Sequence, residues 1–331
     1  MELVCPAGSL PALKAAVDNG ADAVYMGFRN ATNARNFEGL NFDEKGARRG
    51  LAHAHAAGAR VFTAINTYAA AGRWHEWTDA VDRAVDLGVD ALILADPGLI
   101  AYAAADHPDM RLHLSVQASA TTPEAIEFHR RRFGVRRAVL PRVLSLRQVR
   151  RVIAGTDAEL EVFGFGSLCV MVEGRCALSS YVTGEAPNTA GVCSPAKAVR
   201  WVESARGRES RLGGVLIDLY RPDEPAGYPT LCKGRFAVDG QTYYALEEPT
   251  SLNVLDILPE LQQAGVAAVK VEGRQRSPAY VAEATRVMRA ALDQAAADPE
   301  GYVPDPALAA RLDRLAEGRT HTLGALQRRW Q

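Results

Sequence analysis

The sequence has 331 residues, of which 48% are hydrophobic and 23% are charged, and its formal net charge is -1. This length can build one large barrel domain with an elaboration, and the near-neutral charge gives no reason to expect a nucleic-acid partner, because such proteins usually carry a strong basic excess. No apolar run approaches the roughly 18 residues that span a membrane, and Met1–Cys5 lacks the basic region of a secretory signal, so we expect a cytoplasmic protein.

Short apolar runs alternate with amphipathic stretches along the chain. The runs that predict strands are Glu2–Pro6, Ala23–Gly27, Arg60–Asn66, Ala91–Ala95, Arg111–Gln117, Arg137–Pro141, Glu159–Phe165 and Ala267–Glu272. Helices are expected between them, for example over Leu10–Asn19, Trp77–Leu87 and Pro123–Arg132. This alternation predicts parallel βα units, and about eight units predict an α/β fold of the (β/α)₈ barrel type. An open doubly wound sheet is the alternative, but no Gly-x-Gly-x-x-Gly follows the first strand.

The region from residue 165 to residue 256 interrupts the alternation. It holds four of the five cysteines, several Gly/Pro turns and short strand-like runs over Lys197–Glu203, Gly214–Asp218 and Thr242–Leu246. We expect residues 1–164 and 257–297 to form the barrel and residues 165–256 to form a cysteine-bearing insertion. Residues 298–331 are expected to form a C-terminal helix, over Pro306–Ala316, and a tail.

Polar side chains follow most of the predicted strands. In a (β/α)₈ barrel, functional residues cluster at the carboxyl ends of the strands. The candidates are Asn33, Arg35, Asn36, Asn66, Thr67, Asp96, Gln117, Ser119, Arg142, Glu272 and Arg274. Some of them are expected to be caps and turn residues, but turns favour Gly, Pro, Asp and Ser over Arg and Gln. The arginines and glutamine therefore indicate a site.

Four cysteines are spaced as Cys169-x6-Cys176-x16-Cys193-x38-Cys232. Four thiolates from a loop-rich region can hold Zn²⁺ or an iron–sulfur cluster. Zinc sites usually contain cysteines two to four residues apart, whereas a cubane takes one cysteine at each iron corner, so this wide spacing favours a cluster. Zinc and unligated core or redox thiols are the alternatives. Cys5 lies apart in the first predicted strand, where a small buried residue is favoured over a ligand or reactive thiol.

A long motif surrounds the first two of these cysteines. The segment from Glu161 to Ser179 contains Glu-x-Phe-x-x-Gly-Ser-hydrophobic-Cys, then Gly-x-Cys, then Ser, and this order resembles the signature of the peptidase U32 family. Further segments that resemble the family are Glu2–Leu10, Gly20–Tyr25, Gly191–Pro195, Tyr228–Arg235 and Lys270–Pro278. Within that family the sequence is most similar to the UbiU-type branch, which serves ubiquinone biosynthesis.

The resemblance implies one [4Fe–4S] cluster, with Cys169, Cys176, Cys193 and Cys232 as its ligands. It also implies a heterodimer with a UbiV-like protein. Together the two would hydroxylate a prenylated phenol or quinone precursor without oxygen, with prephenate as the oxygen donor. The alternatives are an RNA-hydroxylating enzyme, as in other members of the family, and a zinc-stabilised scaffold. A peptidase is not expected, because Ser167 and Ser179 lack an evident histidine base.

A donor with two carboxylates suggests roles for the residues at the strand ends. Arginines can clamp carboxylates through paired hydrogen bonds, and Arg35, Arg142 and Arg274 are the candidates, with structural ion pairs as the alternative. Glu161 and Glu272 are expected to act as general acid or base, or to pair with those arginines. The cluster is expected to transfer electrons rather than bind substrate, because all four irons would be capped by cysteine.

Overall fold

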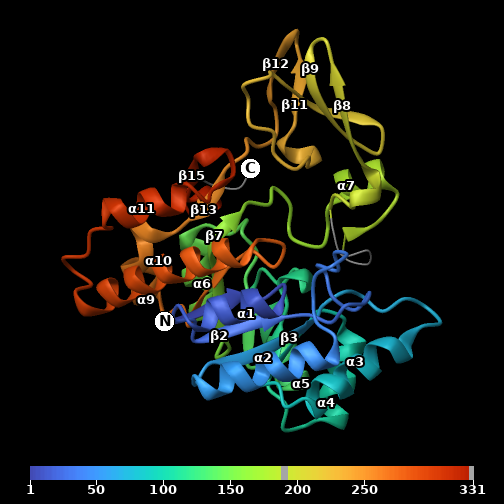
Figure 1. Cartoon of the computed structure of the whole chain (residues 1–331). Helices are drawn as coiled ribbons and strands as arrows, with labels where there is room; N and C mark the ends of the chain where they lie inside the picture. Colours follow the sequence, from blue (N-terminus) through green and yellow to red (C-terminus); the bar gives the residue numbers. More distant parts are fainter. Residues whose placement is uncertain (188–192, 328–331) are drawn as a thin grey trace.

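The structure is a computed structural model that describes residues 1–187 and 193–327. Within these residues, parallel strands follow one another around a barrel, and the last strand closes it by pairing with both the first and the seventh (Figure 1). The barrel strands are β1 (Glu2–Pro6), β2 (Ala23–Met26), β3 (Arg60–Ile65), β4 (Ala91–Leu94), β5 (Leu112–Leu114), β6 (Arg137–Val139), β7 (Glu159–Ser167) and β14 (Ala268–Val271). The predicted (β/α)₈-like barrel is confirmed, and the open sheet is excluded.

Helices cover the outside of the barrel, and most begin at a side chain that caps them. They are α1 (Leu10–Val17), α2 (Glu44–Ala56), α3 (Trp74–Asp86), α4 (Pro97–Asp106), α5 (Pro123–Phe133), α6 (Leu146–Ala154), α9 (Leu258–Ala264) and α10 (Pro278–Ala297). Ser9, Asp43 and Asp96, for example, each accept a hydrogen bond from a backbone N–H of the first turn, which satisfies a donor that has no partner within the helix. The strand expected over Arg111–Gln117 ends at Leu114, because Ser115 caps a 3₁₀ turn over Val116–Ala118.

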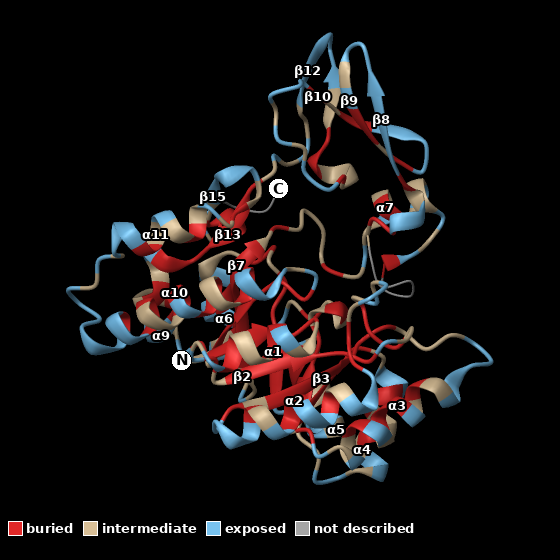
Figure 2. Cartoon of the chain, viewed as in Figure 1, coloured by how far each residue is buried: buried red, intermediate tan, exposed pale blue. Residues whose placement is uncertain are grey.

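The barrel has an apolar middle and a charged floor. Small and aromatic side chains such as Ala64, Phe62 and Tyr25 fill the interior as one buried cluster, and Figure 2 shows the buried strands inside a shell of half-exposed helices. At the amino ends of the strands, the 1%-exposed guanidinium of Arg137 lies 2.8 Å from Glu2 and 2.6 Å from Glu159. These carboxylates offset the cost of burying the Arg137 charge.

Glu159→Gln is expected to lower stability at neutral pH by less than about 1 kcal/mol, because half-exposed ion pairs contribute little. Burial would raise the pKa of Glu159, but hydrogen bonds from Arg111 and Arg137 outweigh it and hold the pKa below 4.5. A lowered carboxylate pKa stabilises the fold above the unfolded-state value, and this contribution is lost as the pH falls through the folded-state value. In urea unfolding, the gap between variant and wild type should therefore close as the pH falls through the lowered pKa of Glu159. A gap independent of pH would contradict the ion pairs.

The insertion forms two small sheets that stand away from the barrel (Figure 1). After α7 (Ala177–Thr183) come the antiparallel strands β8 (Val199–Ser204), β9 (Gly207–Leu212) and β10 (Val215–Tyr220), then the hairpin of β11 (Arg235–Val238) and β12 (Gln241–Tyr244). Among the described residues, no helix combines the length and the apolar character that a bilayer crossing requires.

The barrel sheet extends into both segments that the sequence analysis places outside it. Strand β13 (Ser251–Asn253) pairs antiparallel with the end of β7, and β15 (His321–Thr322) pairs with β13. Helix α11 (Pro306–Asp313) packs against α10. Residues 188–192 of the predicted insertion, which include Gly191 and Val192 of a segment that resembles the family, and residues 328–331 of the predicted tail lie outside the described residues.

Candidate functional site

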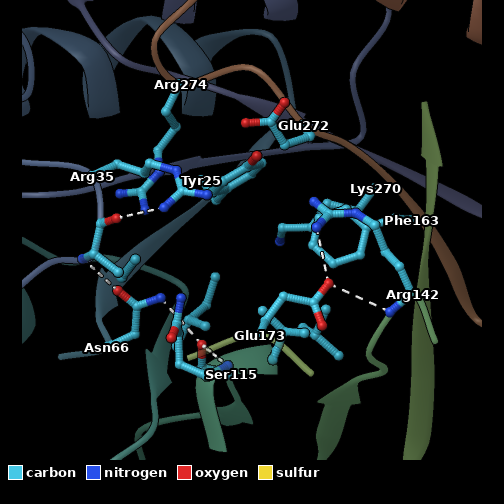
Figure 3. A pocket seen from close by; sticks show the side chains of 16 residues that line it. Tyr25, Arg35, Asn66, Ser115, Arg142, Phe163, Glu173, Lys270, Glu272 and Arg274 are labelled. Atoms are coloured by element: carbon cyan, nitrogen blue, oxygen red, sulfur yellow. Dashed lines mark hydrogen bonds and ion pairs between the residues drawn. The ribbon is translucent and has the colours of Figure 1, made fainter. Parts of the chain in front are cut away.

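A pocket opens at the carboxyl ends of the barrel strands (Figure 3). It is lined by Tyr25, Ala34, Arg35, Ala64, Asn66, Ile93, Ser115, Val116, Gln117, Val139, Arg142, Phe163, Glu173, Lys270, Glu272 and Arg274. Six of the strand-end residues expected from the sequence are therefore together: Arg35, Asn66, Gln117, Arg142, Glu272 and Arg274. Others serve the framework instead, since Asp96 caps α4 and Thr67 donates to the carbonyl of Ala31.

One wall of the pocket is an ion pair on an aromatic ring. Arg142 Nη1 lies 2.9 Å from Glu173 Oε1, and both side chains are less than a tenth exposed. The guanidinium of Arg142 stands 3.7 Å from the ring centre of Phe163, a cation–π contact that strengthens when both groups are desolvated. Burial raises the pKa of Glu173 against the attraction of Arg142, and the second oxygen, Oε2, has no partner among the described residues. Glu173 therefore offers a ligand one oxygen that can hold or accept a proton.

The opposite wall carries Arg274 and Glu272. Arg274 Nη1 donates to Asn33 Oδ1 at 3.0 Å, and complete burial lowers the Arg274 pKa to about 10. Burial would raise the pKa of Glu272, but the nearby charges of Arg35, Arg142 and Arg276 lower it. Glu272 is thus a carboxylate and Arg274 a cation at neutral pH.

Cations outnumber carboxylates around this pocket. Arg35, Arg142, Lys270 and Arg274 line it, against Glu173 and Glu272, and the nearby Glu161 pairs with Lys270, so the excess is one positive charge. Because a buried charge surplus is costly without a counter-ion, the arrangement suits an anionic ligand. The aromatic faces of Tyr25 and Phe163 add an apolar surface for a ring.

Glu161 does not line the pocket. Its Oε1 lies 2.7 Å from Lys270 Nζ and its Oε2 lies 3.3 Å from Arg137 Nη1, inside the barrel. The sequence analysis expects Glu161 to act as a general acid or base, or to pair with Arg35, Arg142 or Arg274. The structure shows ion pairs, but they are with Lys270 and Arg137. Lys270 itself was missed, although it lies in β14 two residues before Glu272 and lines the same pocket. Glu173 was missed because it lies in a loop.

The four candidate cysteines lie in one part of the molecule. All four are partly buried and none forms a disulfide. Cys176 Sγ accepts a hydrogen bond from the N–H of Ser179 in α7, and Ser179 Oγ donates to the carbonyl of Cys193. Helix α7 in turn contacts the 3₁₀ turn Leu231–Lys233, which contains Cys232.

The electrostatics of Cys232 link the four thiols. Its pKa is raised to about 12, first by burial and then by the neighbouring Cys169, Cys193 and Cys176. Among the described residues, no group of three or more His, Cys, Asp or Glu side chains has the arrangement of a metal site. The donor type still fits the expected cluster, because four thiols within electrostatic range of one another are soft ligands of the kind iron–sulfur clusters take.

Cys5 is separate from this group. It is fully buried in β1, where its sulfur accepts a hydrogen bond from Thr285 Oγ1 at 3.2 Å. Burial raises its pKa to about 12, so the thiol stays protonated and unreactive.

The fold and site define a (β/α)₈ barrel protein with a mouth lined by cations and a cysteine-bearing insertion. The chain matches the family described as Peptidase family U32 over residues 8–328, and it belongs to that family. It is 33% identical to the "tRNA hydroxylation protein P" of Escherichia coli strain K12 over 99% of this chain and 74% of that protein. It is 30% identical to the "23S rRNA 5-hydroxycytidine C2501 synthase" of the same organism, over 88% of this chain and 39% of that protein.

A solved structure in the family supports the fold. "The Structure of the U32 Peptidase Mk0906" aligns with a TM-score of 0.50 and 14% identity, covering 84% of this chain and 95% of that one. The family expectation from the sequence is confirmed, whereas the UbiU-type branch stays a prediction.

Proposed function

We propose that this chain is the iron–sulfur subunit of an oxygen-independent hydroxylation system in ubiquinone biosynthesis. Cys169, Cys176, Cys193 and Cys232 would hold a [4Fe–4S] cluster, a UbiV-like protein would be the partner in a heterodimer, and prephenate would donate the oxygen. The observation that carries the proposal is the position of Glu173. It lies between Cys169 and Cys176 in the sequence and lines the barrel pocket, so the ligand-binding mouth and the thiol group share one loop.

The pocket residues would bind and orient the donor. Arg142 and Arg274 stand on different walls and can each take one carboxylate, with fixed donor geometry that a lysine does not provide. Glu173 Oε2 can hold or accept the proton of a donor hydroxyl group, and Glu272 balances the cations. When bound, the cluster would supply or accept single electrons.

The surface of the insertion supports a protein partner. Several large apolar side chains of the insertion are exposed to solvent: Trp201 is 44% exposed, Tyr243 47% and Leu246 53%. Exposed apolar side chains are frequent contacts for other molecules. Exposed aromatic side chains also stack on the bases of RNA, so this surface does not by itself separate a protein partner from RNA.

RNA hydroxylation is the second candidate, and the names of the relatives favour it. Both candidates share hydroxylation of an unsaturated ring and differ in the molecule that carries it. The pocket charges serve the donor in either case, so they do not separate the two.

The test is anaerobic purification of the chain with and without a co-expressed UbiV-like protein. We expect about four irons per chain, a stable complex of the two proteins, and prephenate-dependent hydroxylation of a prenylated phenol. Hydroxylated tRNA or rRNA with an unchanged phenol would favour the second candidate. A colourless protein that contains zinc would exclude both, because Zn²⁺ has no redox chemistry.

A further inference from the structure

The insertion leaves the barrel and returns to it at a narrow neck. The chain leaves at Ser167, the last residue of β7, and returns at Ser251, the first residue of β13. These two residues are direct partners in the antiparallel pairing of the two strands. Glu317, from the C-terminal segment, bonds to both, since its N–H donates to Ser251 Oγ at 2.9 Å and its Oε1 accepts from Ser167 Oγ at 2.7 Å.

A residue from the middle of the insertion reaches the same carboxylate. Lys233, the neighbour of Cys232, pairs with Glu317 Oε2 and donates to Ser167 Oγ at 3.1 Å. The Lys233 side chain is only 7% exposed, so the ion pair is largely shielded from solvent. On the barrel side, Arg276 Nη2 lies 3.2 Å from Glu317 Oε1. Glu317 thus connects the insertion to the barrel, with its carboxylate bonded to the start and the middle of the insertion and its backbone N–H bonded to the end.

Backbone geometry holds Glu317 in this position. Gly318 has φ +61°, and a Cβ there would lie 2.2 Å from the carbonyl oxygen of Pro249. Only glycine allows so close an approach. Thr320 Oγ1 also donates to Pro249 O, at 3.3 Å, before β15 pairs with β13. The segment that carries Glu317 is therefore fixed to the returning strand of the insertion.

The neck also contacts the pocket. Gly166 has φ +131°, and a Cβ there would lie 2.6 Å from the Cβ of Glu272. The next residue, Ser167, donates its N–H to Glu272 Oε2 at 3.4 Å. Ser167 thus contacts Glu272 of the pocket through its backbone and Glu317 through its side chain.

We propose that Glu317 is a positioning residue that locks the cysteine-bearing insertion onto the barrel mouth. It fixes Cys232, through Lys233, relative to Ser167 and the pocket carboxylate Glu272. The consequence for electron transfer rests on the proposed function, whereas the lock itself rests on contacts of the chain alone.

The experiment compares Glu317→Ala, Glu317→Gln and Asp313→Asn in the full-length, metal-free chain. Thiol alkylation by iodoacetamide is followed at each cysteine by mass spectrometry. In Glu317→Ala, Lys233 loses its carboxylate partner, and we expect Cys232 to react about tenfold faster, because the insertion opens locally at lower cost. Glu317→Gln keeps an acceptor for Ser167 and should give a smaller increase. Asp313→Asn is the matched control, since it removes an exposed pair with His321 from the same segment and should behave as wild type.

Cys5, which is fully buried in the barrel, reports on global unfolding in the same samples. An increase at Cys232 with Cys5 unchanged supports the lock, and restoration of part of the effect in Glu317→Gln supports it further. An unchanged Cys232 rate in Glu317→Ala overturns it, and so does a parallel increase at Cys5, which would make Glu317 a general stability residue. Iron analysis of the wild-type holoprotein is separate: absence of iron would overturn the proposed function but leave the alkylation result standing.

Discussion

Replacing Cys232 with alanine is expected to remove the iron from the protein and reduce hydroxylation to background. A cubane with four cysteine ligands exposes an iron corner when one is lost, and no other described cysteine can replace Cys232, because Cys5 is buried inside the barrel wall. The same result is expected for Cys169, Cys176 and Cys193. Iron content and visible absorbance of anaerobically purified protein measure the first effect, and product formation with the partner measures the second.

Cys5→Ala is the matched control for this series. It deletes one buried sulfur atom and its hydrogen bond from Thr285, which should cost about 1 kcal/mol of stability. Iron content and activity should stay at wild-type levels. Iron retained at wild-type stoichiometry in Cys232→Ala would show that the four-cysteine assignment is wrong.

The barrel could be predicted from the sequence because its signal repeats. Each βα unit carries its own apolar run and its own signal for the end of the helix. An error in the bounds of one unit therefore leaves the predicted number of units unchanged. The predicted strand Glu2–Pro6 matches β1 at both ends, and Ala23–Gly27 differs from β2 by one residue. Strands β13 and β15 were missed because they are three and two residues long. Such short strands are set by tertiary pairing rather than by local pattern.

Site residues could be predicted where they follow a barrel strand, because functional residues of a (β/α)₈ barrel cluster at the carboxyl ends of its strands. Arg142, Glu272 and Arg274 follow strands, and the closed barrel brings strand ends together whatever the sequence distance. Glu173 and Glu317 do not follow barrel strands. Glu173 enters the pocket from the insertion, and Glu317 reaches the neck from the C-terminal segment, for which the sequence analysis predicts only a helix and a tail. The positions of Glu173 and Glu317 depend on tertiary contacts of the insertion and the C-terminal segment with the barrel. The hydrophobic periodicity of the sequence does not encode these contacts.

Arg274→Ala and Arg142→Ala are each expected to weaken binding of a dicarboxylate donor such as prephenate by about 10- to 150-fold. This corresponds to one charged hydrogen-bonding contact, about 1.5 to 3 kcal/mol. Isothermal titration with the donor measures it. Arg142→Ala also leaves the buried Glu173 without its cation, so it should be measured beside Arg142→Ala/Glu173→Gln, which removes the unpaired charge. Unchanged donor affinity in both single variants would show that Arg142 and Arg274 do not bind the carboxylates of the donor.

Arg60→Ala is the matched control, because Arg60 pairs with Glu2 at the opposite end of the barrel and should leave donor affinity unchanged.

The pH dependence of donor binding gives a second measurement. Burial lowers the pKa of Arg274 to about 10, so its charge is complete at neutral pH and declines as the pH rises toward that value. Donor affinity of the wild type should therefore fall as the pH approaches 10, and the fall should be smaller in Arg274→Ala, where Lys270, whose pKa burial also lowers, is the cation left to lose its charge. A fall of equal size in the wild type and in Arg274→Ala would show that the charge of Arg274 does not cause it.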